Sequence, residues 1–173
     1  MEKIIIGSDG SVYTLKEAVK AHLIERGFDV KDVGTTADTP VDYFDAAANV
    51  ASAVSSGEYE RGIVICGTGM GVNLMANRFP GVLCGLCESV HTVEHARKIN
   101  NINILAMGGW FQGPELGCMM ADAFLDTAWK QGLDEETAAL VTKGYEETLR
   151  REREVRGRVP KNTKNLCCPL SYD

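Results

Sequence analysis

The sequence has no stretch that approaches the roughly 20 consecutive apolar residues needed to span a membrane. Its opening residues, MEKIIIGSDG, lack the long apolar region of a secretory signal peptide. We therefore expect a cytoplasmic protein. The chain also lacks an internal repeat and an interdomain linker, and its 173 residues fit one domain with its own hydrophobic core.

Positive charge is in short supply. Lysine and arginine total 18 against 24 aspartates and glutamates, which gives a formal net charge of −6. A protein that binds nucleic acid or an acidic membrane needs a basic face, so both classes are disfavoured. Otherwise the composition, with 45% hydrophobic and 24% charged residues, is that of an ordinary globular domain.

The chain also lacks a complete set of metal ligands. Cys84 and Cys87 form a C-x-x-C, but no second pair accompanies them. We interpret both as thiols of a buried strand and Cys118 as a core residue of a helix. His91 and His95 lie one helical turn apart without a third ligand, so no metal is expected. Without a signal peptide, reduced thiols are expected in place of disulfides.

Short apolar runs alternate with segments of helical periodicity, a pattern typical of βαβ units and a parallel sheet. Strands are expected at residues 3–9, 28–34, 61–67, 81–87 and 102–108. Helices are expected at residues 14–27, 42–57, 71–79, 89–100 and 114–132. Five strands with intervening helices predict a doubly wound α/β sheet with right-handed crossovers.

Residues 1–132 would form this α/β unit, and residues 133–173 a C-terminal helix and tail at a subunit interface, all within one domain. The charged segment DEETAALVTKGYEETLRREREVRG predicts a helix that packs on a partner or is solvated. We expect the tail around Cys167 and Cys168 to be ordered, because NLCCPLSY is too apolar for a typical linker.

Three polar turns follow predicted strands: Gly7-Ser8-Asp9-Gly10, Cys66-Gly67-Thr68-Gly69-Met70-Gly71 and Gly108-Gly109-Trp110. Ligands of open α/β sheets bind beyond the carboxyl ends of the strands, so these turns are the expected site. The second turn leads into a helix, and its unpaired amides suit an oxyanion or a phosphate. Its glycines do not make a dinucleotide fingerprint, because they follow a middle strand.

Cys66 would lie near the positive end of the following helix, which favours the thiolate as a base or nucleophile. The alternative is a buried cysteine that ends a strand. Asp9, at the end of an adjacent strand, can accept or donate protons, and no serine and histidine complete a hydrolase triad beside Cys66. Proton transfer therefore fits better than acyl transfer.

Four segments resemble the family of ribose-5-phosphate isomerase B and galactose-6-phosphate isomerase: GSD (7–9), DYFD (42–45), GIVICGTGMGVNLMANRFPGV (62–82) and ARKINNINILAMGG (96–109). The likeness covers about residues 3–130, with CGTGxG followed by AN-x-x-x-G as a specific motif. It implies a three-layer αβα Rossmann-like fold with a five-stranded parallel sheet. It also implies a homodimer or homotetramer in which two subunits build each active site.

The resemblance further implies aldose–ketose isomerisation of a small sugar phosphate through a cis-enediol, without metal or cofactor. Cys66 matches the family's base. Thr68 and the amides of the glycine turn match the groups that stabilise the enediolate oxygen. Asp9, the third expected catalytic residue, matches a residue beside the sugar hydroxyls. Substrate-binding residues are expected at Ser8, Gly10, Tyr43, Gly67, Gly69, Met70, Gly71 and Asn100.

Several positions depart from the family's pattern. Gly10 replaces a histidine, and Ile99 replaces the histidine that opens the sugar ring. A substrate that stays open-chain, such as a tetrose phosphate, would not need that step. The family's phosphate-binding arginines would fall at Trp110 and near Leu133 and Thr137. Either another basic group substitutes for them, or the ligand lacks phosphate. Candidate substitutes are Arg97, Lys143, Lys161 and Lys164.

The leading hypothesis is a cofactor-independent aldose–ketose isomerase of a small sugar phosphate with four to six carbons. A non-catalytic or partner-dependent sugar-binding subunit of a heteromeric isomerase is the first alternative. An isomerase of a non-phosphorylated sugar and an epimerase that works through an enediolate also remain open. Trp110 would either stack on the apolar face of a sugar or pack at a subunit contact.

Overall fold

The computed structural model describes residues 1–156, so the expected order of the tail around Cys167 and Cys168 lies outside the described residues. Its strands are β1 Lys3–Ser8, β2 Asp29–Asp32, β3 Arg61–Cys66, β4 Cys84–Leu86 and β5 Ile104–Gly108. Its helices are α1 Tyr13–Glu25, α2 Tyr43–Ser55, α3 Met70–Ala76, α4 Val90–His95, α5 Pro114–Asp126 and α6 Glu135–Arg156. The strands form one all-parallel sheet in the order β2-β1-β3-β5-β4, which confirms the predicted α/β architecture.

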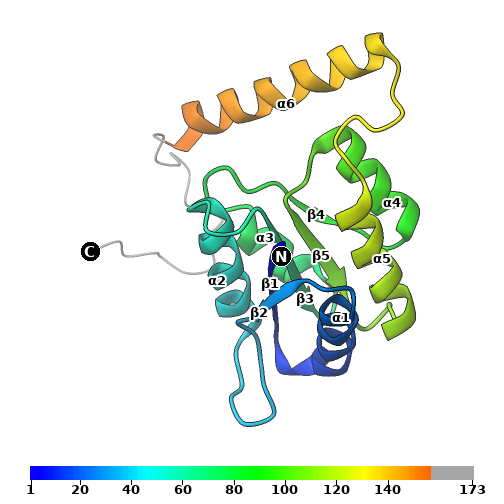
Figure 1. The fold of residues 1–173 in the computed structure, drawn as a ribbon. Coiled ribbons are helices and arrows are strands. Elements are labelled where there is room, and N and C mark those ends of the chain that lie inside the picture. The colour runs from blue at the N-terminus through cyan, green and yellow to red at the C-terminus, as the bar shows by residue number, and fades with distance from the viewer. Residues whose placement is uncertain (157–173) are drawn as a thin grey trace.

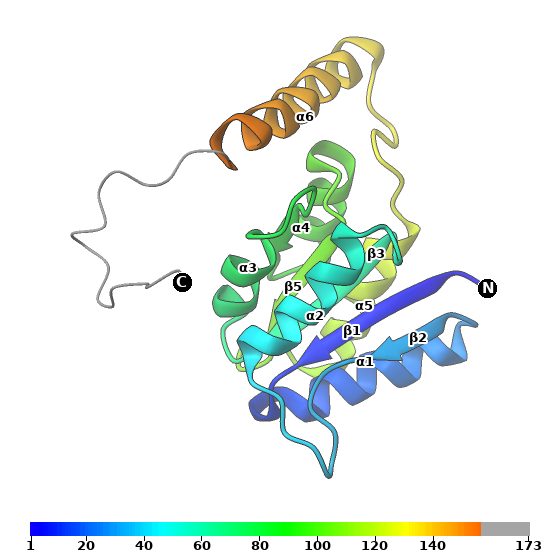
Figure 2. The same cartoon turned by 90° about the vertical axis from the view of Figure 1, so that its left-hand side faces the viewer.

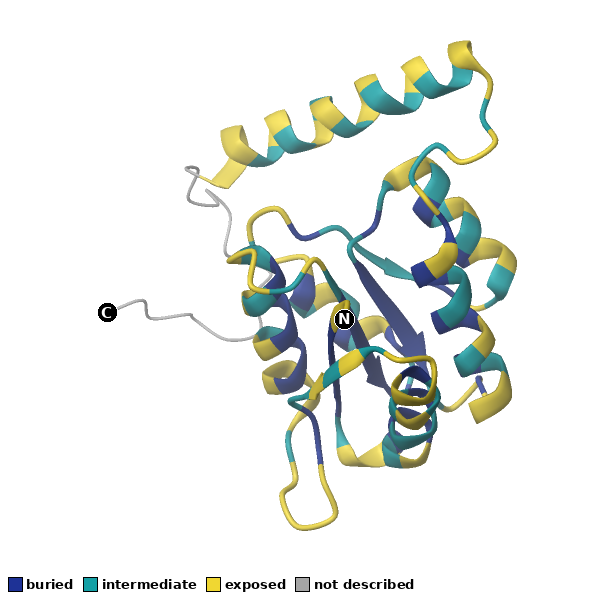
Figure 3. Cartoon of the chain, in the orientation of Figure 1, coloured by how far each residue is buried: buried dark blue, intermediate teal, exposed yellow. Residues whose placement is uncertain are grey.

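Successive side chains of each strand point to opposite faces of the sheet, and each face packs into its own hydrophobic core. Ile4 and Ile6 of β1 pack with α1, α4 and α5, whereas Ile5 packs with α2 and α3. Strands buried on both faces read as continuous apolar runs, which is why IIIG and IVIC were recognisable. Figure 1 shows α2 and α3 on one side of the sheet and α1, α4 and α5 on the other. The burial colours of Figure 3 mark the central strands β1, β3 and β5 as buried, whereas the edge strands β2 and β4 are partly exposed.

Several predicted boundaries are wrong. The helix expected at 114–132 ends at Asp126, because Thr127 is extended and buried and its carbonyl accepts a hydrogen bond from Arg97. The helix expected at 89–100 is α4 followed by a π-helical turn, Ala96–Asn100, which ends where Asn101 adopts a positive φ of 52°. The strand expected at 81–87 is shortened to β4, since Gly81 turns the chain with a φ of 71°.

The charged C-terminal helix is present as α6, and none of its residues is buried. It crosses one end of the molecule (Figures 1 and 2) and contacts the rest of the chain near its middle and at its C-terminal end. The Tyr145 ring packs on Trp129 with centroids 4.9 Å apart, and Arg156 donates to the Arg78 carbonyl at 2.8 Å. Between α6 and the body lies a cleft of about 810 Å³, lined by residues of β4, α4, the π-helical turn and α6. Within residues 1–156, no helix combines the length and apolar character needed to cross a membrane.

Candidate active site

Turns from three neighbouring strands meet at the carboxyl edge of the sheet. Ser8 of β1 is level with Ile65 of β3, and Cys66 is level with Gly108 of β5, so the turns that follow lie side by side. They enclose a cavity of about 210 Å³. Its lining residues are Asp9, Ser11, Tyr43, Cys66, Gly67, Thr68, Gly71 and Trp110.

Backbone contacts join the turns after β3 and β5. The Gly109 amide donates to the Cys66 carbonyl at 3.0 Å, and the Trp110 amide donates to the Gly67 carbonyl at 2.9 Å. A Cβ on Gly69, whose φ is +76°, would lie 2.8 Å from the carbonyl carbon of Met107. A Cβ on Gly108 would lie 2.7 Å from the Thr68 carbonyl oxygen. Glycine is therefore required at both positions for the two turns to pack backbone against backbone.

Cys66 ends β3 at the boundary between the hydrophobic core and the cavity. The residue is 5% exposed and packs with the apolar side chains under α2 and α3, yet it also lines the cavity. Two further thiols, those of Cys84 and Cys87, lie away from this cavity. Burial raises the pKa of Cys84 to about 12, and burial also raises the pKa of Cys87. These two groups stay protonated at neutral pH, as expected for structural thiols.

Two aromatic side chains form walls of the cavity by resting on glycines. A Cβ on Gly67 would lie 2.5 Å from the Trp110 indole, and a Cβ on Gly71 would lie 2.7 Å from the Tyr43 ring. Sequence reasoning interpreted both glycines as amide donors alone. Their second role depends on which turns are neighbours, and the spacing of residues within one turn does not carry that information.

Asp9 is held at the start of a short 3-10 turn, Gly10–Val12. One of its carboxylate oxygens accepts hydrogen bonds from the Ser11 amide at 2.7 Å and from the Ser11 hydroxyl at 2.6 Å. The buried Ser8 hydroxyl donates to the Asp9 carbonyl at 3.0 Å. Ser11 was not among the predicted site residues. The Asp-x-Ser pattern, typical of an Asx turn that caps a helical turn, was the available signal.

The remaining predicted residues are not in the lining of this cavity. Ser8 is buried beneath Asp9, and the exposed Met70 begins α3. Gly10 and Gly69 shape the turns without lining the cavity. Asn100 lies elsewhere in the same chain, beside Ile99 in the cleft under α6.

Among the residues that the structure describes, no lysine or arginine lines the cavity, and Asp9 is its one formally charged side chain. Arg97, one of the candidate substitutes for the missing phosphate-binding arginines, does not line this cavity. Arg97 is buried, and it donates to the carbonyls of Thr127 and Ile102 instead. Burial and the neighbouring Arg61 lower the pKa of its guanidinium. Lys143 is exposed on α6.

The two histidines at helical spacing do not belong to a metal site in the described part of the chain. The rings of His91 and His95 have centroids 4.2 Å apart. Within residues 1–156, no three side chains of histidine, cysteine, aspartate or glutamate are grouped so that they could bind a metal ion.

Comparison with known proteins gives consistent matches. The family model described as Ribose/Galactose Isomerase matches residues 4–141. The 4-deoxy-4-sulfo-D-erythrose isomerase of Clostridium sp. (strain MSTE9) is 48% identical over 134 residues, which are 77% of this chain and 84% of that protein. The D-erythrulose-4-phosphate isomerase of Pectobacterium atrosepticum is 34% identical over 76% of this chain and 88% of that protein. The crystal structure of ribose-5-phosphate isomerase B from Mycoplasma genitalium with bound ribulose-5-phosphate has a TM-score of 0.78 at 33% identity, over 88% of this chain and 97% of that one.

Proposed function

The chain belongs to the ribose/galactose isomerase family, and from this premise we propose that it interconverts an aldose and a ketose of four carbons that carry an anionic group on C4. One observation carries the proposal: Cys66, Asp9 and Thr68 line the same cavity at the carboxyl edge of the sheet. Thiol, carboxylate and hydroxyl are the groups that a proton transfer through an enediolate requires.

In this reaction the Cys66 thiolate removes the proton from C2 of the aldose. The electron pair of the C–H bond forms a C1=C2 double bond, and the aldehyde oxygen takes up the negative charge. The Gly67 amide and the Thr68 hydroxyl stabilise that oxygen. The Thr68 hydroxyl accepts a hydrogen bond from the Met70 amide at 3.3 Å, so its own proton is available to donate. Return of the proton from sulfur to C1, with transfer of the O2 proton to O1, gives the ketose. Asp9 binds a substrate hydroxyl.

The substitution at Ile99 supports an open-chain substrate. A ring-opening acid is needed only when the sugar cyclises. An erythrose whose C4 carries a sulfonate or a phosphate ester has no free C4 hydroxyl, so it cannot close a furanose ring. Two relatives are named for such four-carbon sugars, a C4 sulfonate and a C4 phosphate. An isoleucine in place of the ring-opening histidine is compatible with both.

The charge of the cavity favours the sulfonate. A phosphate monoester carries about −1.5 to −2 at pH 7 and needs a cationic partner when it leaves water. A sulfonate carries a single negative charge at every physiological pH. Neutral donors line the described cavity, with Asp9 as its charged member, so the monoanion is desolvated at lower free-energy cost. We therefore place 4-deoxy-4-sulfo-erythrose ahead of erythrose 4-phosphate as the substrate.

Exposed apolar side chains on the turn after β5 and on α3 support a homodimer or homotetramer. Trp110, Phe111, Met70 and Leu74 are each more than half exposed, although monomeric proteins rarely leave such a group uncovered. A second copy would cover this surface and would bring its own Ile99 and Asn100 to the cavity. The four cysteines of the described residues are free, which fits the reducing cytoplasm as the site of action.

The test is turnover by the purified chain with 4-deoxy-4-sulfo-D-erythrose, D-erythrose 4-phosphate and D-ribose 5-phosphate. We expect the four-carbon sugars to be isomerised, with the sulfonate favoured in kcat/KM by about tenfold, which corresponds to about 1.4 kcal/mol. Cys66→Ala should lower kcat by about 10²–10⁴-fold. In deuterated water the ketose should gain deuterium at C1 without epimerised aldose. A folded chain that turns over none of these sugars would favour the partner-dependent subunit instead.

A further inference from the structure

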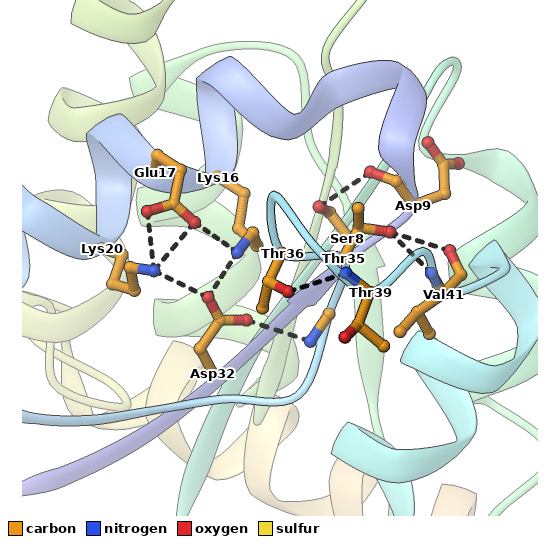
Figure 4. Close-up of polar contacts among 11 residues, drawn as sticks. Ser8, Asp9, Lys16, Glu17, Lys20, Asp32, Thr35, Thr36, Thr39 and Val41 are labelled. Atoms are coloured by element: carbon orange, nitrogen blue, oxygen red, sulfur yellow. Dashed lines mark hydrogen bonds and ion pairs between the residues drawn. The ribbon is translucent and has the colours of Figure 1, made fainter.

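A cluster of four charged side chains lies on the far side of the turn that carries Asp9 (Figure 4). At its centre is Lys16 of α1, a lysine with no exposed surface. Its ammonium group contacts Asp32 at the end of β2, Glu17 at 2.5 Å, and the face of the Tyr13 ring, whose centroid is 5.3 Å away. Lys20 completes the cluster at 2.8 Å from Asp32 and 2.7 Å from Glu17. A fully buried lysine is rare without paired carboxylates and loses much of its hydration free energy on folding.

Asp32 is the member of the cluster that connects it to the site. One carboxylate oxygen binds the two lysines, and the other accepts the Gly34 amide at 3.0 Å. Burial by itself would raise the pKa of Asp32, but the hydrogen bonds from Lys16, Lys20 and Gly34 hold it below the usual value. Asp32 is therefore ionised at neutral pH and fixes the first residues of the β2–α2 connection, residues 33–42.

This connection is hydrogen-bonded to the end of β1 and is closed on itself just before α2. The Thr35 amide donates to the Ser8 carbonyl at 2.8 Å, directly before Asp9. The Thr35 hydroxyl donates to the Val41 carbonyl at 3.0 Å and accepts from the Val41 amide at 2.9 Å, two residues before Tyr43. Gly34 lies so close to β1 that a Cβ there would be 2.3 Å from the Ser8 nitrogen. The connection thus sets the separation between Asp9 and Tyr43.

We propose that Lys16 and Asp32 are positioning residues for the active site: their buried ion pair fixes residues 33–42, and these hold Asp9 and Tyr43 in the cavity wall. The catalytic part of this statement rests on the proposed function. Neither Lys16 nor Asp32 lines the cavity, so both act through Gly34 and Thr35. An error of 1 Å in the placement of substrate-contacting groups lowers rates by about 100-fold, so the effect is measurable.

Glu17 supplies the matched control. It is a carboxylate of the same cluster, it binds the same two lysines, and hydrogen bonds from Lys16 and Lys20 outweigh its burial and lower its pKa as they do for Asp32. Its hydrogen bonds stay within α1, however, and none reaches residues 33–42. Asp32→Ala and Glu17→Ala therefore remove similar charge–charge contacts and differ in the contact to the connection.

The experiment compares full-length wild type, Asp32→Ala and Glu17→Ala at a temperature where unfolding curves show all three to be folded. We expect Asp32→Ala to lower kcat and raise KM, for a fall in kcat/KM of about 10–100-fold, whereas Glu17→Ala stays within about threefold of wild type. A role in stability alone would change neither constant in a folded protein. Equal kcat/KM values for the two folded variants would overturn the proposal.

A second readout does not depend on turnover. Amide hydrogen exchange at Thr35 and at Ser11, whose amide is bound by Asp9, should accelerate at least tenfold in Asp32→Ala and stay unchanged in Glu17→Ala. Unchanged hydrogen exchange in Asp32→Ala would overturn the positioning role, whether or not the wild type is active. A wild type that turns over no four-carbon sugar would count against the proposed function alone. Should Asp32→Ala not fold, Asp32→Asn and Glu17→Gln replace the pair. The same order is expected, because the asparagine must turn its NH₂ group toward either the two ammonium groups or the Gly34 amide, whereas Glu17 has no hydrogen bond to the connection.

Discussion

Replacing Gly67 by alanine tests whether the aromatic wall and the glycine turn form one unit. The added Cβ would lie 2.5 Å from Cε2 of Trp110, and ordinary carbon–carbon contacts begin near 3.5 Å. The indole must therefore move by about 1 Å, or the turn must. Because the ring is 67% exposed, it can swing outward, and we expect a loss of about 1 kcal/mol, the low end for overpacking. For a chain of this length, that corresponds to a fall in Tm of about 2–4 °C.

The effect on catalysis should be larger than the effect on stability. The Gly67 amide is expected to face the enediolate oxygen, and Trp110 forms the adjacent wall, so a shift of about 1 Å should lower kcat/KM by about 10–100-fold. The assay is a double-mutant cycle of Gly67→Ala, Trp110→Ala and the double variant, with kcat/KM and Tm measured for each. Removing the indole relieves the overlap, so the double variant should be more stable and more active than the two separate losses predict. Strictly additive losses would refute the proposed contact between the ring and the turn.

Three further predictions concern groups outside the cavity. Arg97→Met should lower the free energy of unfolding in urea by about 1–3 kcal/mol, because the Thr127 and Ile102 carbonyls lose their donor, while kcat stays within about twofold. A large loss of kcat in the folded variant would contradict this structural role. The stability difference between wild type and Asp32→Asn should be constant above about pH 5. Since the folded pKa of Asp32 lies below the unfolded value of about 3.9, the stabilisation from its ionised form is lost as pH falls through the folded pKa. A difference in unfolding free energy that stays constant down to pH 2 would contradict the lowered pKa. Cys84, with a pKa of about 12, should resist alkylation by iodoacetamide at pH 8 until the chain unfolds, as peptide mass spectrometry would report.

The sequence carries enough information for the centre of the sheet because β1, β3 and β5 are buried on both faces. Runs such as IIIG and IVIC have few alternative placements, and the glycine-rich turns after them had to meet at the carboxyl edge once the sheet was parallel. The C-terminal end of α5 could not be predicted from the sequence. Apolar residues continue at helical spacing past Asp126, and the buried hydrogen bond from Arg97 to Thr127, which ends the helix, joins residues 30 positions apart.

Arg97 also shows why the electrostatics of the site could not be predicted. A sequence shows a positively charged residue but not the carbonyl groups to which it donates hydrogen bonds in the fold. Arg97 was therefore considered as a group that could bind an anion. Lys16 posed the opposite problem. On an amphipathic helix it would be taken for a solvated residue, and its burial follows from Asp32 on β2, 16 residues away. Both assignments depend on tertiary neighbours.

The tight stacking of the Thr68 and Gly108 backbones has a consequence for how new substrates arise on this scaffold. With no room for a side chain at Gly69 or Gly108, the floor that carries Cys66 tolerates little remodelling. Tyr43 and Trp110, in contrast, are exposed residues whose rings rest on Gly71 and Gly67. Laboratory selection for longer or differently charged sugars should therefore accumulate exchanges at those two rings and leave the glycines untouched.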